Sequence, residues 1–136
     1  MTRGAPVCSD RLHVAAGCGA IIEHLAFLLA EGDGRDCVLL PTPSYGALWN
    51  DFCVRAGVAI EEVPMHLPNT AQELAHYSAS SADRTVPLIT SVDLDAAASR
   101  AVAKGLRPKF LFLINPLNPL GILFRDSELL EMLDWC

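Results

Sequence analysis

Residues 109–121 read Lys-Phe-Leu-Phe-Leu-Ile-Asn-Pro-Leu-Asn-Pro-Leu-Gly, and this stretch decides the fold class of the chain. Its first half, 109–114, is nearly all apolar, which is typical of a strand covered on both faces in a parallel sheet. Its second half, 115–121, holds two Asn-Pro pairs and a glycine, a composition that favours a turn. We therefore expect a buried strand that leads directly into a conformationally restricted loop.

The rest of the chain alternates between strand-like and helix-like patterns. Short apolar runs predict three further strands, at residues 12–16, 37–40 and 58–63. Apolar spacing, capping residues and glycine stops predict four helices, at residues 19–30, 46–56, 90–104 and from 126 onward. This alternation predicts an α/β fold of three layers, with a mostly parallel sheet and helices on both faces.

Two of the expected helices carry apolar residues that share a face. In the first helix these residues are Ile21, Leu25, Leu28 and Leu29. In the last helix they are Leu129, Leu130 and Leu133. Because residues three and four apart lie on the same side of a helix, each set predicts the apolar side of its helix.

Composition restricts the function classes. With 136 residues, 51% of them hydrophobic and 19% charged, the chain has the size of one globular domain and is too apolar to be disordered. Its formal charge is -6 and its basic residues are scattered, so we expect no nucleic-acid or membrane partner. Residues 64–90 are rich in Ser, Thr, Ala, Asn and Pro, and they are expected to be a loop insertion.

Signals for targeting and metal binding are absent from the sequence. Residues 1–10 lack the apolar core of a signal peptide, and no apolar run approaches the length of a membrane span. The five cysteines are widely spaced and form no metal-ligand pattern with histidines, so we expect free thiols and no metal site. A cytoplasmic location is the default expectation.

Three loops stand where a parallel sheet would bind a ligand, beyond the carboxyl ends of its strands. Gly17, Cys18 and Gly19 precede a helix, whose free amides favour a phosphate. Tyr45 lies in the proline-stiffened loop 41–46, where its ring could stack on a flat ligand. Asn118 lies between two prolines, and its amide can donate to a ligand oxygen.

Each loop also has a reading without a ligand. The first could be a tight turn, the second could hold a tyrosine that packs on its own domain, and the third could be an Asn-Pro turn. Two standard phosphate motifs fail here: Ile22 stands where the dinucleotide fingerprint needs its last glycine, and no Gly-Lys-Ser/Thr sequence follows. A generic nucleotide-binding domain is therefore the weakest alternative.

Taken in order, the three loops resemble a known family. Asn-Pro-Leu-Asn-Pro-Leu-Gly at 115–121 resembles the N-P-x-N-P-x-G signature of class I/II aminotransferases, which are fold-type I pyridoxal-phosphate enzymes. The chain is most similar to the 1-aminocyclopropane-1-carboxylate synthase-like branch, from the runs 27–30 and 40–43 and from Asn-Pro-Leu-Gly. The resemblance implies that residues 1–136 are part of the large, cofactor-binding domain of such an enzyme.

The resemblance also implies a role for each loop. Gly17, Cys18 and Gly19 would form the turn against the phosphate of pyridoxal 5'-phosphate, Tyr45 would stack on the pyridine ring, and Asn118 would bond the phenolic oxygen. The family acts on amino acids, by transamination or a related elimination, and the full-length enzymes are expected to be homodimers.

The resemblance points equally to what the chain lacks. The Schiff-base lysine and the acidic partner of the pyridine nitrogen would both lie after the last helix, so we assign no catalytic residue. The only lysines are Lys104, at a helix end, and Lys109, at the start of a strand. We therefore expect an inactive enzyme fragment, and the alternative is a truncated, non-catalytic paralogue that acts as a binding or regulatory module.

Overall fold

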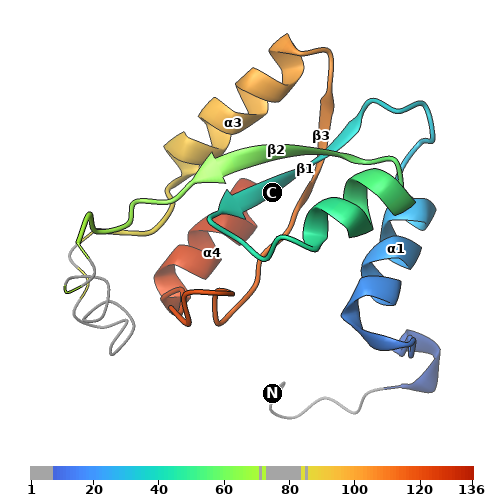
Figure 1. The fold of residues 1–136 in the computed structure, drawn as a ribbon, viewed down its shortest axis with the longest axis horizontal. Coiled ribbons are helices and arrows are strands. Elements are labelled where there is room, and N and C mark those ends of the chain that lie inside the picture. Colours follow the sequence, from blue (N-terminus) through green and yellow to red (C-terminus); the bar gives the residue numbers. More distant parts are fainter. Residues whose placement is uncertain (1–7, 71, 73–83, 85) are drawn as a thin grey trace.

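The structure is a computed structural model, and it describes residues 8–70, 72, 84 and 86–136 (Figure 1). After a short 3-10 turn, η1 (Ser9–Arg11), helices and strands alternate along the chain. In order they are α1 (Gly17–Leu29), β1 (Asp36–Thr42), the π-helix η2 (Asn50–Arg55), β2 (Ala59–Pro64), α3 (Ser91–Ala103), β3 (Arg107–Leu111) and α4 (Asp126–Trp135).

The three strands form a parallel sheet in the order β2-β1-β3, with β1 at its centre. Cys37 of β1 pairs with Ala59 of β2 on one side and with Pro108 of β3 on the other. The register with β3 shifts by one residue between Cys37 and Val38. Because all three strands run the same way, the loops after them leave from one edge of the sheet.

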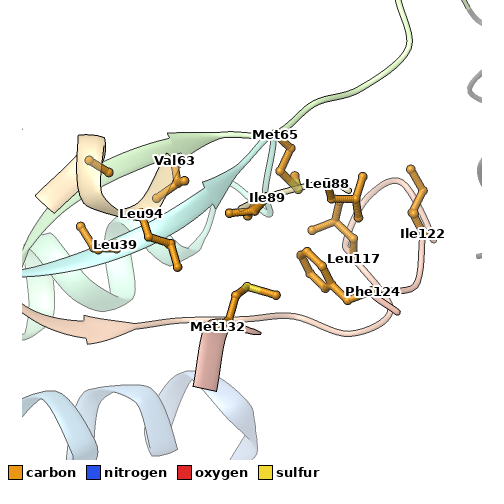
Figure 2. Packing of buried hydrophobic residues seen from close by; sticks show 11 residues of the cluster. Leu39, Val63, Met65, Leu88, Ile89, Leu94, Leu117, Ile122, Phe124 and Met132 are labelled. Carbon is orange, nitrogen blue, oxygen red and sulfur yellow. The ribbon is translucent and has the colours of Figure 1, made fainter. Parts of the chain in front are cut away.

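Buried side chains form one cluster on each face of the sheet. On one face Leu39 and Val63 pack with Leu94 of α3 and Met132 of α4 (Figure 2). Val38 and Leu40 alternate with Leu39 along β1, so their side chains lie on the other face. There they pack against residues of α1 and η2. The expected α/β fold, with helices on both faces of a parallel sheet, is thus confirmed.

The strand expected at residues 12–16 is wrong. No strand of the described residues pairs with this stretch, and Val14 is 88% exposed. An apolar run gains nothing from the extended conformation unless a neighbour accepts its backbone hydrogen bonds and covers its side chains. As a result α1 begins at Gly17, two residues earlier than expected, and directly after an irregular segment.

The apolar sides expected for the first and last helices are also wrong in part. In α1, Ile22 and Ala26 are buried, whereas Leu28 is 78% exposed. In α4, Glu128 and Met132 are buried, while Leu130 and Leu133 are exposed. Both helices carry apolar residues around most of their circumference, so the side that meets the sheet is chosen by tertiary packing.

β3 differs from its expectation as well. It runs over Arg107–Leu111 instead of 109–114, and its residues are only half-buried or exposed. The reason is its position, because β3 is an outer strand of the sheet that the described residues form. Residues 71, 73–83 and 85 of the expected insertion, 64–90, lie outside the described residues, and the insertion stays an expectation.

α3 begins with a capping box. The backbone N–H of Asp93 donates to the Thr90 hydroxyl at 3.4 Å, and the Asp93 carboxylate accepts from the Thr90 backbone N–H at 2.8 Å. The helix ends before Gly105, whose φ of +78° suits glycine. The helix expected at 90–104 is therefore confirmed at both ends.

Replacing Thr90 with alanine removes one half of this box. We expect the variant to lose about 0.5–2 kcal/mol of unfolding free energy, which is the usual range for a lost N-cap side chain. Urea unfolding followed by circular dichroism measures the change. Ser99→Ala, at an exposed position of the same helix, is the comparison, and a Thr90→Ala variant as stable as the wild type would contradict the cap's contribution.

A charged cluster lies at the opposite edge of the sheet, where β1 and β3 begin. Arg107 donates from Nε to the buried Asp36 carboxylate at 2.6 Å and from an Nη to Asp33 at 3.1 Å. The bond from Arg107 holds the pKa of Asp36 below its ordinary value of 3.8, with smaller help from the Glu31 backbone N–H. This pair joins the starts of two neighbouring strands.

The lowered pKa of Asp36 predicts that the free energy of unfolding falls as the pH is lowered. The stabilisation is present above the ordinary pKa of 3.8 and is lost as pH falls through the lower pKa of the folded state. We expect unfolding free energy measured from pH 6 down to about pH 2 to fall more steeply in the wild type than in Asp36→Asn. Equal acid slopes in the two proteins would contradict the assignment to Asp36.

Candidate functional site

The glycines of the first expected loop lie inside a helix. Gly17, Cys18 and Gly19 form the first turn of α1, and Gly17 has a φ of +85°. The N-cap residue, Ala16, supplies no side-chain hydrogen bond, so the first amides of α1 lack a cap. Such a helix start presents unsatisfied N–H groups and the positive pole of the helix dipole. The Gly17 N–H itself donates to the Ala15 carbonyl at 2.9 Å, and the phosphate role expected for this turn stays a prediction.

Asp51, at the second position of η2, lies beside this turn and was not anticipated from the sequence. A β-carbon built on Gly19 would stand 3.3 Å from Asp51 Oδ1, so α1 and η2 approach closely here. Asp51 lies 4.0 Å from Arg55, which also lies 3.5 Å from Glu23 of α1. A carboxylate at this position repels an anion at the helix start, and Arg55 partly offsets its charge. No local sequence pattern marks this contact.

Tyr45 lies in the loop between β1 and η2. Its backbone carbonyl accepts from the Leu48 N–H at 3.2 Å, in the turn that leads into η2. Its side chain is 51% exposed. A tyrosine that served only to fill its own core would be buried, so the exposure leaves a ring face free for a ligand.

Asn118 lies at the tip of the loop after β3. Two backbone bonds close the loop beneath it: Leu117 N–H to the Ile122 carbonyl at 2.7 Å and Gly121 N–H to the Leu117 carbonyl at 2.6 Å. Asn118 is exposed, and within the described part of the chain its carboxamide makes no hydrogen bond. This side chain is therefore free to donate to a ligand.

Two of the three expected loops adjoin helices that pack on each other. α1 and η2 share a buried cluster that includes Ile22 and Phe52, so the first turn of α1 and the Tyr45 loop are attached to neighbouring elements. The Asn118 loop follows β3, which pairs with β1. In the described residues, Asn118 forms no hydrogen bond with Tyr45 or with the start of α1.

Both lysines lie away from these loops. Lys104 follows the last residue of α3, and its Nζ lies 2.5 Å from Glu61 Oε2. Lys109 lies within β3, and its Nζ lies 3.1 Å from Glu31, in the connection that precedes β1. Each ammonium group is therefore held by a carboxylate that lies outside the three loops.

The described residues offer neither a metal-binding group of side chains nor a membrane-spanning helix. They contain no group of three or more His, Cys, Asp or Glu side chains placed to hold a metal ion. None of the described helices has the length and apolar character needed to cross a membrane.

Comparison with known proteins identifies the family. The model of the family "Aminotransferase class I and II" matches residues 5–136, which is nearly the whole chain. The chain belongs to the aminotransferase class I and II family. The resemblance based on the three loops is thereby confirmed, and the α/β fold is that of a fold-type I family of pyridoxal-phosphate enzymes.

Within the aminotransferase family, curated relatives include 1-aminocyclopropane-1-carboxylate synthase 4 of Oryza sativa subsp. japonica, 36% identical over 88% of this chain and 21% of the relative. Synthase 7 of Arabidopsis thaliana is 33% identical over 93% of this chain and 24% of the relative. "Probable inactive 1-aminocyclopropane-1-carboxylate synthase-like protein 2" of Mus musculus is 32% identical, over 94% and 20%. The chain thus spans less than a quarter of the length of these relatives.

Proposed function

We propose that this chain is the cofactor-facing part of the large domain of a pyridoxal-phosphate-dependent enzyme that acts on amino acids. The observation that carries the proposal is the placement of the three family loops. They are attached to the start of α1 and to the carboxyl ends of β1 and β3, in a chain that matches the family model. Parallel α/β sheets bind their ligands at this edge.

The residues present fit the cofactor in three respects and conflict with it in one. The uncapped start of α1 suits a phosphate, the exposed ring of Tyr45 suits a pyridine ring, and the free carboxamide of Asn118 suits a phenolic oxygen. The carboxylate of Asp51 opposes the phosphate. Bound pyridoxal phosphate would supply an electron sink, and these side chains would bind and orient it.

We further propose that the isolated chain is inactive. Neither Lys104 nor Lys109 is placed to form a covalent link with a cofactor at the three loops, because each pairs with a carboxylate elsewhere. The test is borohydride reduction of the chain with equimolar pyridoxal phosphate, followed by peptide mass mapping. We expect no adduct above that of the heat-denatured chain. A specific adduct, or turnover of an amino acid, would refute the inactivity.

A second candidate function is a non-catalytic binding module that holds the cofactor without a covalent link. One observation favours it: the mouse relative, 32% identical, carries the words "Probable inactive" in its name. The coding sequence beyond Cys136 discriminates between the two. A downstream Asp-x-x-Tyr segment followed by a Ser-x-x-Lys segment supports the enzyme, and a stop codon supports the module.

The cofactor site makes a prediction for Asn118. In Asn118→Ala the hydrogen bond to the charged phenolic oxygen is lost, which costs about 1.5–3 kcal/mol and weakens pyridoxal phosphate binding by about 10- to 150-fold. Absorbance titration measures both the affinity and the spectrum of the bound cofactor. Asn69→Ala, at an exposed asparagine after β2, is the matched control and should bind as the wild type does.

Tyr45→Ala in the same titration should weaken binding by about 2- to 10-fold through lost stacking, which is worth about 0.5–1.5 kcal/mol. If Asn118→Ala and Tyr45→Ala both leave the affinity unchanged, the assignment of the cofactor site is wrong.

A further inference from the structure

The loop after β3 is closed by a side chain as well as by its backbone. The Phe124 N–H donates to Oδ1 of Asn115 at 3.1 Å. Asn115 comes before the closed turn and Phe124 comes after it, directly ahead of Arg125, the N-cap residue of α4. This bond therefore ties the segment leaving β3 to the segment entering α4.

The base of the loop is fixed on the core, whereas its tip is not. Leu117, Ile122 and Phe124 are all buried and belong to the same core cluster as Met132 of α4 (Figure 2). Asn118 projects from this base and is exposed. The direction of its side chain thus depends on how firmly residues 115–117 are held against residues 122–124.

The loop is short of backbone N–H donors that could hold residues 115–117 against residues 122–124. Pro116 and Pro119 lack an N–H, so two of the loop's amides cannot donate. Within the described residues, the bonds that cross the loop include the two at Leu117, with Ile122 and Gly121, and the bond at Asn115, and Leu120 has an interaction of its own. Asn115 is itself exposed, so its contribution is this bond and little burial.

We propose that Asn115 is a positioning residue: its carboxamide closes the mouth of the loop and so orients Asn118 toward the cofactor, without touching the cofactor itself. The consequence for binding rests on the proposed function, while the consequence for loop order does not. Asn115 differs in this from Asn118, whose carboxamide is the group offered to the ligand.

The first test needs no cofactor. In Asn115→Ala, nuclear magnetic resonance should show lower backbone order at residues 117–121 and at least about tenfold faster hydrogen exchange at the Phe124 amide, which has lost its acceptor. Exchange in β1 should stay unchanged. Asn115→Asp keeps an acceptor oxygen and should restore both readouts. Unchanged order at 117–121 in Asn115→Ala overturns the proposal, and so does slow exchange at Phe124.

The second test is a double-mutant cycle on pyridoxal phosphate affinity. Asn115→Ala should weaken binding by about three- to tenfold in the wild type, the range of one hydrogen bond, and by less than about twofold in the Asn118→Ala background. An equal loss in both backgrounds would mean that Asn115 contacts the cofactor directly, which overturns the positioning role. All four proteins are compared at a temperature where circular dichroism shows them folded.

The two proposals fail in different ways. If Asn118→Ala weakens binding and Asn115→Ala does not, the positioning role is wrong and the proposed function stands. If the wild type does not bind pyridoxal phosphate, the proposed function fails for this chain, and the order of residues 117–121 alone decides the role of Asn115.

Discussion

Replacing Glu128 with alanine should lower the free energy of unfolding by about 3–5 kcal/mol, the usual cost of breaking a buried ion pair. Glu128 is 2% exposed and pairs with Arg84, which is 4% exposed. Its carboxylate also accepts from the backbone N–H of Leu88 and of Arg125, each at 2.6 Å. Alanine at 128 removes this carboxylate from the buried guanidinium and from the two backbone N–H groups.

The measurement is equilibrium unfolding in urea. Asp134→Ala, at an exposed acidic residue of the same helix, is the matched control and should change the free energy by no more than about 0.5 kcal/mol. If Glu128→Ala were no more disruptive than this control, the buried pair would contribute nothing to the fold.

Leu94→Ala should lower the free energy of unfolding by about 2–5 kcal/mol, because it leaves a cavity in the larger core cluster. Leu94 is fully buried in α3 and packs between the sheet and α4, close to Leu39 and Met132 (Figure 2). The size of the loss within this range depends on how far these neighbours can collapse into the space.

Val92→Ala provides the comparison for Leu94→Ala, because Val92 lies on the same helix and is 71% exposed. We expect its unfolding free energy to stay within about 0.5 kcal/mol of the wild type. A small loss at Leu94, similar to that at Val92, would show that α3 does not pack on the sheet as described.

Local sequence patterns predicted the elements that local physics determines. Thr90 and Asp93 form a capping box between neighbours, so the start of α3 could be predicted from four residues. The central strand β1 could be predicted because residues 37–40 are apolar and buried on both faces. The same holds for the exposed positions of Tyr45 and Asn118, which follow strands in loops that proline restricts.

The remaining features depend on residues distant in sequence. Residues 12–16 have the composition of a strand, yet the described residues offer them no partner. Glu128 is buried because Arg84 and the Leu88 amide meet it from 40 or more positions away. The approach of Asp51 to Gly19 likewise depends on how η2 packs on α1. Periodicity within one helix cannot report such contacts.

The order of strands in the sheet has a consequence for the rate of folding. β1 pairs with β2, which follows it closely along the chain, but the bond between Asp36 and Arg107 joins residues 71 positions apart. Parallel pairing over such a span requires closure of a long loop, and the chain loses this entropy before the contacts that offset it can form. We therefore expect β1, η2 and β2 to assemble first, and the docking of β3, with the loop that carries Asn118, to limit the folding rate.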